Sequence, residues 1–155
     1  MDRLRNLGFL IKDVSRLYTR RFEEHANEIG VTLPQCKALV YLARNEGINQ
    51  VRLAELTDID PMSLVRILDR MEADGWIERR FDPSDRRAKR LYSKSKAKPI
   101  LERIWRVGDA TRAEALDSLS AQQRNTLIDL LEQLQGNLSK LEPLPEPTAR
   151  KTARG

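Results

Sequence analysis

A strongly signalled helix that ends just before a short basic hairpin constrains the fold of this chain more than any other feature. Asp60 can accept the free N–H groups at a helix start, and Pro61 suits the first helical position, where its missing N–H is not needed. Hydrophobic spacing carries this helix to about Asp74, and Gly75 ends it. The pattern then changes from helical to strand-like, which predicts a mainly α fold with a small β-hairpin.

The segment after this helix predicts a hairpin with a basic tip. Trp76–Phe81 is rich in aromatic and β-branched residues, Asp82–Asp85 has turn chemistry, and Ala88–Ser93 returns as a second strand. Between Trp76 and Lys98 nine basic residues stand against three acidic ones, and this excess of +6 is larger than the +5 of the whole chain. A run of charged residues is usually a solvated loop. A functional interpretation of this basic hairpin therefore depends on the helix that precedes it.

Apolar residues at helical spacing predict five further helices. In each of them the apolar residues recur every three or four positions, which makes one stripe along the helix. Gly30 ends the first helix, and Ser120 with Gln123 has the spacing of a capping box that opens the last. The five segments are about Asp2–Ile29, Leu33–Arg44, Val51–Thr57, Lys96–Leu116 and Ser120–Leu141.

Two helices joined by a short turn and followed by a basic hairpin make a winged helix-turn-helix, in which the second helix enters the DNA major groove. Projected at about 100° per residue, the helix from Pro61 separates an apolar side from a side with two arginines. Arginine can pair with guanine, serine with bases or phosphate, and methionine can contact a thymine methyl. An ordinary amphipathic surface helix is the alternative, and the adjoining basic hairpin favours DNA. The apolar side holds Leu64, Ile67, Leu68 and Met71, and the other side holds Met62, Ser63, Arg66 and Arg70.

The composition excludes several classes of protein. At 155 residues, with 40% hydrophobic and 33% charged residues, the chain suits one globular domain. No apolar run approaches the roughly 18 residues of a membrane helix, and no secretory signal is recognisable, so we expect a cytoplasmic protein without a membrane partner. One cysteine, Cys36, and one histidine, His25, exclude a disulfide framework and a structural zinc site. Because triad, metal and phosphate-loop signatures are missing, we expect no enzyme, no metal and no cofactor.

Several short motifs stand at defined places along the chain. They are Val31-Thr32-x-x-Gln35, Leu53-Ala54-Glu55-Leu56, Pro61-x-Ser63-Leu64-Val65-Arg66-x-Leu68-Asp69, Gly75-Trp76-Ile77-x-Arg79 and Asp82-x-x-Asp85-Arg86-Arg87-Ala88-Lys89-Arg90. Together they resemble the MarR family of bacterial transcription regulators. The SLVR and DRRAKR strings, with Arg16 in the first helix, are most similar to its SlyA branch.

The resemblance implies roles for individual residues of the hairpin, which would be the wing, and of the helix before it. Arg66 matches the arginine of the recognition helix, and Arg86 and Arg87 match a wing-tip pair, one of which enters the minor groove. Asp85 matches an aspartate that braces an arginine rather than contacting DNA. Lys89 is expected to contact a phosphate, which carries no sequence information.

The stripes of the terminal helices predict a homodimer. They are too long to be covered by a winged-helix unit of about 65 residues, and exposed stripes of that size imply a partner surface. We therefore expect dimerisation helices in residues 1–30 and 99–141, around a DNA-binding lobe in residues 31–98. The proline-rich residues 142–155 predict a disordered basic tail.

The resemblance also implies a cavity for a small aromatic carboxylate between the dimer helices and the DNA-binding lobe. Arg16 would supply the counter-charge and Tyr18 an aromatic wall. Cys36 stands where many relatives carry a bulky aromatic residue, so one wall would be smaller here. Taken alone, Cys36 is interpreted as a small buried hydrophobe, with a redox switch as the alternative.

These features together predict a sequence-specific transcription regulator that binds palindromic operators as a homodimer and responds to a small aromatic acid. A winged-helix module that binds protein instead of DNA is the alternative. Such a module would be expected to carry a neutral or apolar wing instead of the run RRAKR. An enzyme is the third class, and the missing catalytic signatures oppose it.

Overall fold

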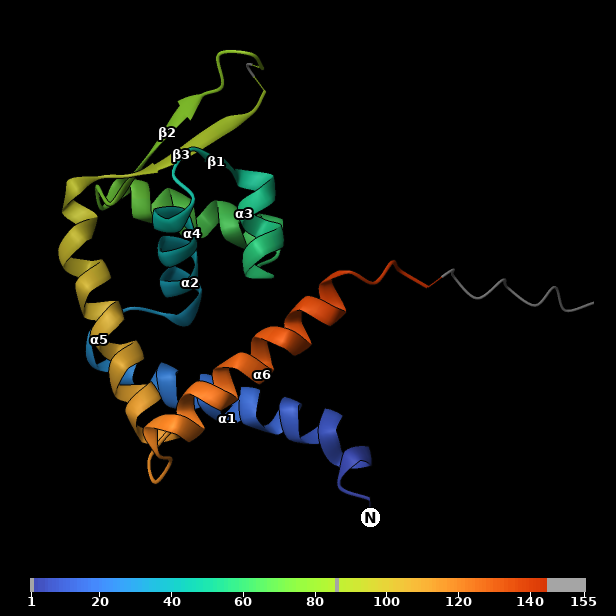
Figure 1. Ribbon diagram of the computed structural model, residues 1–155. Helices are drawn as coiled ribbons and strands as arrows, with labels where there is room; N and C mark the ends of the chain where they lie inside the picture. The colour runs from blue at the N-terminus through green and yellow to red at the C-terminus, as the bar shows by residue number, and fades with distance from the viewer. Residues whose placement is uncertain (1, 86, 145–155) are drawn as a thin grey trace, which may run out of the picture. The chain divides into compact units, whose positions relative to one another are not determined.

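The computed structural model describes residues 2–85 and 87–144 (Figure 1). The chain forms two compact units, Met1–Ala115 and Leu116–Gly155. The first unit contains η1 (Leu4–Asn6), α1 (Leu7–Glu28), α2 (Leu33–Arg44), β1 (Ile48–Asn49), α3 (Gln50–Thr57), α4 (Pro61–Ala73), β2 (Ile77–Phe81), β3 (Lys89–Ser93), η2 (Ser95–Ala97) and α5 (Lys98–Ala115). The second contains α6 (Ala121–Ser139).

The local signals for helix starts and ends are confirmed. Asp60 caps α4, because its Oδ2 accepts the N–H of Ser63 at 3.1 Å. Gly30 and Gly75 take positive φ angles of 72° and 77° after α1 and α4, where other residues would be strained. Ser120 opens α6 with a complete capping box.

Two expectations for the elements are corrected. The first helix was expected from Asp2, but its start is a separate 3-10 turn, η1, and α1 begins at Leu7 without a side-chain cap. The strand β1 was not expected at all, because two residues are too short to show an alternating pattern. It pairs with β3 at Ile48 and Leu91 and completes an antiparallel sheet of order β1-β3-β2.

A single apolar core holds α4 against the rest of the first unit. The core side chains come from helices α1 to α5, from η2, from the loop after α1 and from the sheet, whose strands contribute Ile77 and Leu91. Beyond this anchored base the hairpin of β2 and β3 projects away from the helices (Figure 1). The fully buried large side chains are Leu39, Leu42, Leu53, Leu64, Leu68, Met71, Ile77, Leu91 and Thr111.

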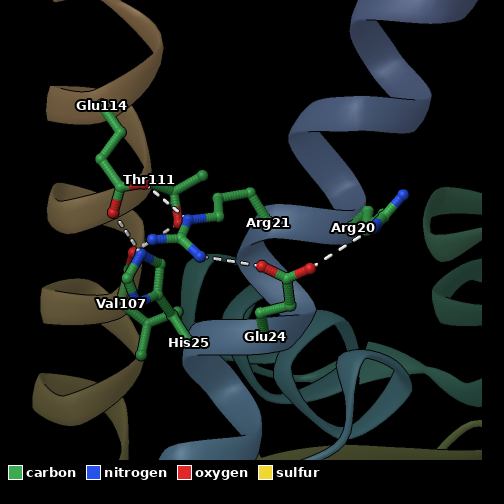
Figure 2. A network of polar contacts seen from close by, with 7 residues as sticks. All are labelled: Arg20, Arg21, Glu24, His25, Val107, Thr111 and Glu114. Atoms are coloured by element: carbon green, nitrogen blue, oxygen red, sulfur yellow. Dashed lines mark hydrogen bonds and ion pairs between the residues drawn. The ribbon is translucent and has the colours of Figure 1, made fainter.

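A polar network ties α1 to α5, as Figure 2 shows. Arg21 Nε donates to one carboxylate oxygen of Glu114 at 2.5 Å, and His25 Nε2 lies 2.5 Å from the other. Arg21 also donates to Glu24 at 2.8 Å. The hydrogen bond from Arg21, followed by that with His25, lowers the pKa of the Glu114 carboxyl. His25 therefore lies at the junction of α1 and α5.

The second unit leaves its helix uncovered. No residue of α6, all of which the structure describes, is buried. Arg124 holds the turn before the helix by donating to the carbonyls of Leu116 and Leu119, both at 3.1 Å. No described helix of either unit is long and apolar enough to span a membrane.

Candidate nucleic-acid interface

The helix α4 has one buried and one exposed side, as its spacing predicts. Leu64, Leu68 and Met71 are fully buried, whereas Met62 is 72% exposed. The other three residues predicted for the polar side, Ser63, Arg66 and Arg70, are exposed as well. Two guanidinium groups, a hydroxyl and a thioether therefore share one accessible helix side.

A largely buried arginine on the wing braces this helix, a contact that was not predicted from the sequence. Arg79 on β2 is only 12% exposed, and its Nη2 lies 2.8 Å from Asp69 Oδ1. Its Nη1 lies 3.5 Å from Glu72, and Nη2 also donates to the carbonyl of Val65 at 3.5 Å. The linear spacing gives no signal for this contact, because it depends on how the strand packs against the helix.

The brace also neutralises an acidic group near the exposed side of α4. At 100° per residue, Asp69 projects only about 20° from Met62 and 60° from Arg66. Its side chain is 61% exposed, so an unpaired carboxylate here would repel a phosphate backbone. The charge of Arg79 offsets this repulsion.

The base of the wing tip is held by Asp82. Its Oδ1 accepts the N–H and the hydroxyl of Ser84 at 2.9 and 2.7 Å, and its Oδ2 accepts from Arg90 Nε at 3.0 Å. These bonds, led by the backbone N–H of Ser84, lower the pKa of Asp82 to about 2. Arg90 also donates to the carbonyl of Gly47 at 3.4 Å, which ties the wing to the loop before β1.

The tip itself presents basic side chains beside a hollow. Arg87 and Lys89 are exposed, and Asp85 Oδ1 accepts the backbone N–H of Arg87 at 3.0 Å. Both basic residues line a hollow of about 560 Å³ that Asp69 and Arg79 also line. Arg86 lies outside the described residues. That Asp85 braces an arginine side chain therefore stays a prediction. The structure thus places the wing tip and α4 around one concave surface.

A second cavity lies in the first unit, between α1, α2 and α5. Its volume is about 260 Å³, and its lining is almost entirely apolar. Tyr18 and Cys36 line it as expected, but Arg16 does not, and Arg16 Nη2 lies 3.4 Å from Asp13 on the exposed side of α1. The lining residues are Tyr18, Thr19, Phe22, Leu33, Cys36, Lys37, Val40, Tyr41, Ile104, Trp105 and Gly108.

Two side chains of this cavity bear on its chemistry. Lys37 is the one charged residue among those that line it, and no spacing in the sequence singled it out. Cys36 is 2% exposed, and burial raises the pKa of its thiol to about 11. The cysteine therefore contributes a small apolar wall rather than a reactive thiolate. Among the described residues, no group of three or more His, Cys, Asp and Glu side chains could hold a metal ion.

Comparison with known proteins places this architecture in one family. The MarR family model matches residues 31–89, which contain the helix-turn-helix and most of the wing. The structure of the transcriptional regulator SlyA is 31% identical, covers 90% of this chain and 95% of its own, and has a TM-score of 0.67.

Two structures of MarR from Escherichia coli are similar as well. The wild-type apo form is 29% identical over 83% of this chain and 95% of its own, with a TM-score of 0.75. A cysteine-to-serine mutant of the same protein, complexed with operator DNA, is 29% identical over 83% and 92%, with a TM-score of 0.69. The chain therefore belongs to the MarR family of winged-helix transcription regulators and is not an enzyme.

Proposed function

We propose that this chain binds double-stranded DNA sequence-specifically as a homodimer on palindromic operators. The observation that carries the proposal is the exposed side of α4, which is mainly polar, lies opposite three fully buried apolar side chains and is braced from the wing by Arg79. A helix held this firmly can present its side chains to base edges without first becoming ordered. A similar structure, that of the E. coli MarR mutant, is a complex with operator DNA.

The side chains of α4 suit different parts of the major groove. Arg66 can bind guanine O6 and N7 together, and Met62 can contact a thymine methyl. Ser63 Oγ lies 3.4 Å from Asp60 Oδ2, so its hydroxyl proton has a partner and its lone pairs can accept from a base or water. Arg70, one turn after Arg66, is placed for a base or a phosphate.

The wing would act in the neighbouring minor groove and on the backbone. We propose that Arg86 or Arg87 enters the minor groove, where a narrow A·T-rich segment concentrates negative potential. Lys89 would contact a phosphate. Asp85 would hold the tip without contacting DNA.

The dimer proposal rests on apolar side chains that nothing within the described units covers. The stripe runs along α1, and a second set lies on α6. We propose that residues 1–30 and 99–141 pair with a second copy and that residues 31–98 form the DNA-binding lobe. A two-fold dimer would present two α4 helices about 34–36 Å apart, which requires a palindromic site. The exposed residues are Leu7, Phe9, Leu10, Ile11, Val14, Leu17 and Tyr18 on α1, and Leu127, Ile128, Leu130, Leu131 and Leu138 on α6.

The apolar cavity supports a small aromatic acid as effector. Its ring would lie between Tyr18 and Trp105, with Cys36 as a small wall. Two cations are candidates for the acid group: Lys37, which lines the cavity, and Arg16, which the family resemblance implies. Lys37→Ala and Arg16→Ala separate them, because only loss of the true partner should weaken salicylate binding in calorimetry. Equal binding by both variants and the wild type would contradict a charge-paired acid.

A salt titration of binding to duplex DNA tests the proposed function. The affinity for DNA should fall steeply with salt, because each Lys or Arg on a phosphate releases a counterion. The slope gives the number of such contacts, and Lys89→Ala should reduce it by about one. A protein-binding winged-helix module would show no salt-dependent duplex binding. That result would contradict the proposal.

A further inference from the structure

A glycine inside α5 forms part of the wall of the apolar cavity. Gly108 lies within Lys98–Ala115, in the helix interior, where glycine is less favourable than alanine. Packing does not require a glycine there, because an added Cβ would meet no neighbouring group within 4 Å. The helix therefore accepts a conformational cost at a position where a side chain would fit.

The missing side chain leaves open space on the side of α5 that lines the cavity. Ile104 and Trp105 line the same cavity and lie on this side, one turn before Gly108. Helical side chains lean toward the N-terminus, so a side chain at position 108 would extend toward these two residues. It would take up part of the 260 Å³ that the cavity now offers.

We propose that Gly108 is a specificity-determining residue, because its missing side chain sets the largest aromatic acid that the cavity accepts. The inference rests on the proposed effector function and adds the size class of the ligand. An apolar cavity of about 150 Å³ already holds benzene. The cavity here is larger, at about 260 Å³. It therefore has room for two fused rings, and Lys37 is the one charged residue among those that line it.

Calorimetry with two probes tests the size limit. Salicylate carries one ring and 3-hydroxy-2-naphthoate carries two. The wild type should bind both acids. Gly108→Ala should weaken binding of the naphthoate at least about tenfold and that of salicylate less than about threefold, and Gly108→Leu should abolish both.

Gly136→Ala and Gly136→Leu are the matched controls. Gly136 also lies inside a helix and also has no group within 4 Å of an added Cβ, but it does not line the cavity. Neither control should change the binding of either acid, and analytical ultracentrifugation checks that both stay dimeric, because α6 belongs to the proposed dimer interface. Retention of wild-type affinity for both acids by Gly108→Leu would overturn the proposal. Far-UV circular dichroism checks each variant, and Gly108→Ala remains decisive if the leucine variant does not fold.

Xenon provides a probe that does not depend on the effector. It binds in apolar cavities, and the methyl NMR signals of Val40 and Ile104, which line this one, would report it. The wild type and Gly136→Leu should show saturable shifts, and Gly108→Leu should lose them. If xenon shows this pattern but neither acid binds the wild type, the proposed effector class is wrong while Gly108 still controls the cavity. Equal xenon shifts in the wild type and both leucine variants, or none in the wild type, would overturn the role of Gly108.

Discussion

The helices α4 and α1 expose opposite kinds of surface. In α4 the apolar side is buried except for the partly exposed Ile67, and the exposed side is mainly polar and flanked by the Arg79 brace. In α1 only Ala26 is buried, and a stripe of apolar side chains is exposed along its first half. Removal of exposed apolar area from water is favourable, so such a surface tends to bind another apolar surface. Exposed arginine and serine side chains instead favour a polar ligand. The exposed side of α4 therefore suits a polyanionic ligand, whereas the apolar stripe of α1 suits the protein partner proposed above.

The largest expected effect comes from removing the second uncovered helix. A chain that ends after Leu119 should lose the dimer at micromolar concentration, because the apolar surface of α6 is gone. Operator affinity should then fall by about 10²- to 10⁴-fold, since the two half-sites are no longer bound by one linked molecule. Analytical ultracentrifugation and fluorescence anisotropy measure the two changes.

A chain that ends after Leu144 is the control for this truncation. It keeps α6 and should behave as the full protein does in both measurements. A stable, folded monomer of the full chain would contradict the interpretation of the apolar stripes as a dimer surface.

The next effect concerns the polar side of α4. Arg66→Ala should cost about 1–3 kcal/mol of operator binding and relax the preference at one base pair, if Arg66 binds a guanine. Lys89→Ala should instead weaken binding to all duplexes alike. Anisotropy with the operator and with a scrambled duplex distinguishes them. Equal losses on both duplexes for Arg66→Ala would show that Arg66 does not read a base.

A smaller effect is expected from breaking the brace between wing and helix. Arg79→Met should weaken operator binding about tenfold, or about 1.4 kcal/mol, because α4 is less firmly held and Asp69 is no longer neutralised. Adding Asp69→Asn removes the exposed carboxylate and should restore part of the affinity. If Asp69→Asn restores no operator affinity, Arg79 acts only by holding α4 in position and not by neutralising Asp69. Unchanged binding by Arg79→Met would show that the brace does not matter for DNA.

The smallest effect concerns the wing turn. The pKa of Asp82 is lowered to about 2, so its bonds stabilise the fold above the unfolded pKa of about 3.9 and lose their effect as the pH falls toward 2. Ser84→Ala removes the hydroxyl donor and should raise the pKa of Asp82. Carboxyl NMR titration measures the shift, and stability at pH 7 should change little. An unchanged pKa would contradict the contribution of the Ser84 hydroxyl.

The sequence predicted those parts of the molecule that depend on neighbouring residues. The start of α4 follows from Asp60 and Pro61, and its two sides follow from spacing alone. Contacts between distant segments were not predictable in this way. Arg79 meets Asp69 only because β2 packs beside α4, and Lys37 lines the cavity only because α2 packs against α1 and α5.

Selection of bound sequences from a random duplex pool shows whether α4 reads DNA as part of a two-fold dimer. If the exposed side of α4 reads DNA in a two-fold dimer, the wild type should enrich an inverted repeat whose half-sites lie about 10–10.5 base pairs apart, centre to centre. The same selection with Arg66→Ala should lose one position of each half-site and keep the repeat. A wild-type pool without an enriched motif, or with a single unrepeated half-site, would contradict the account.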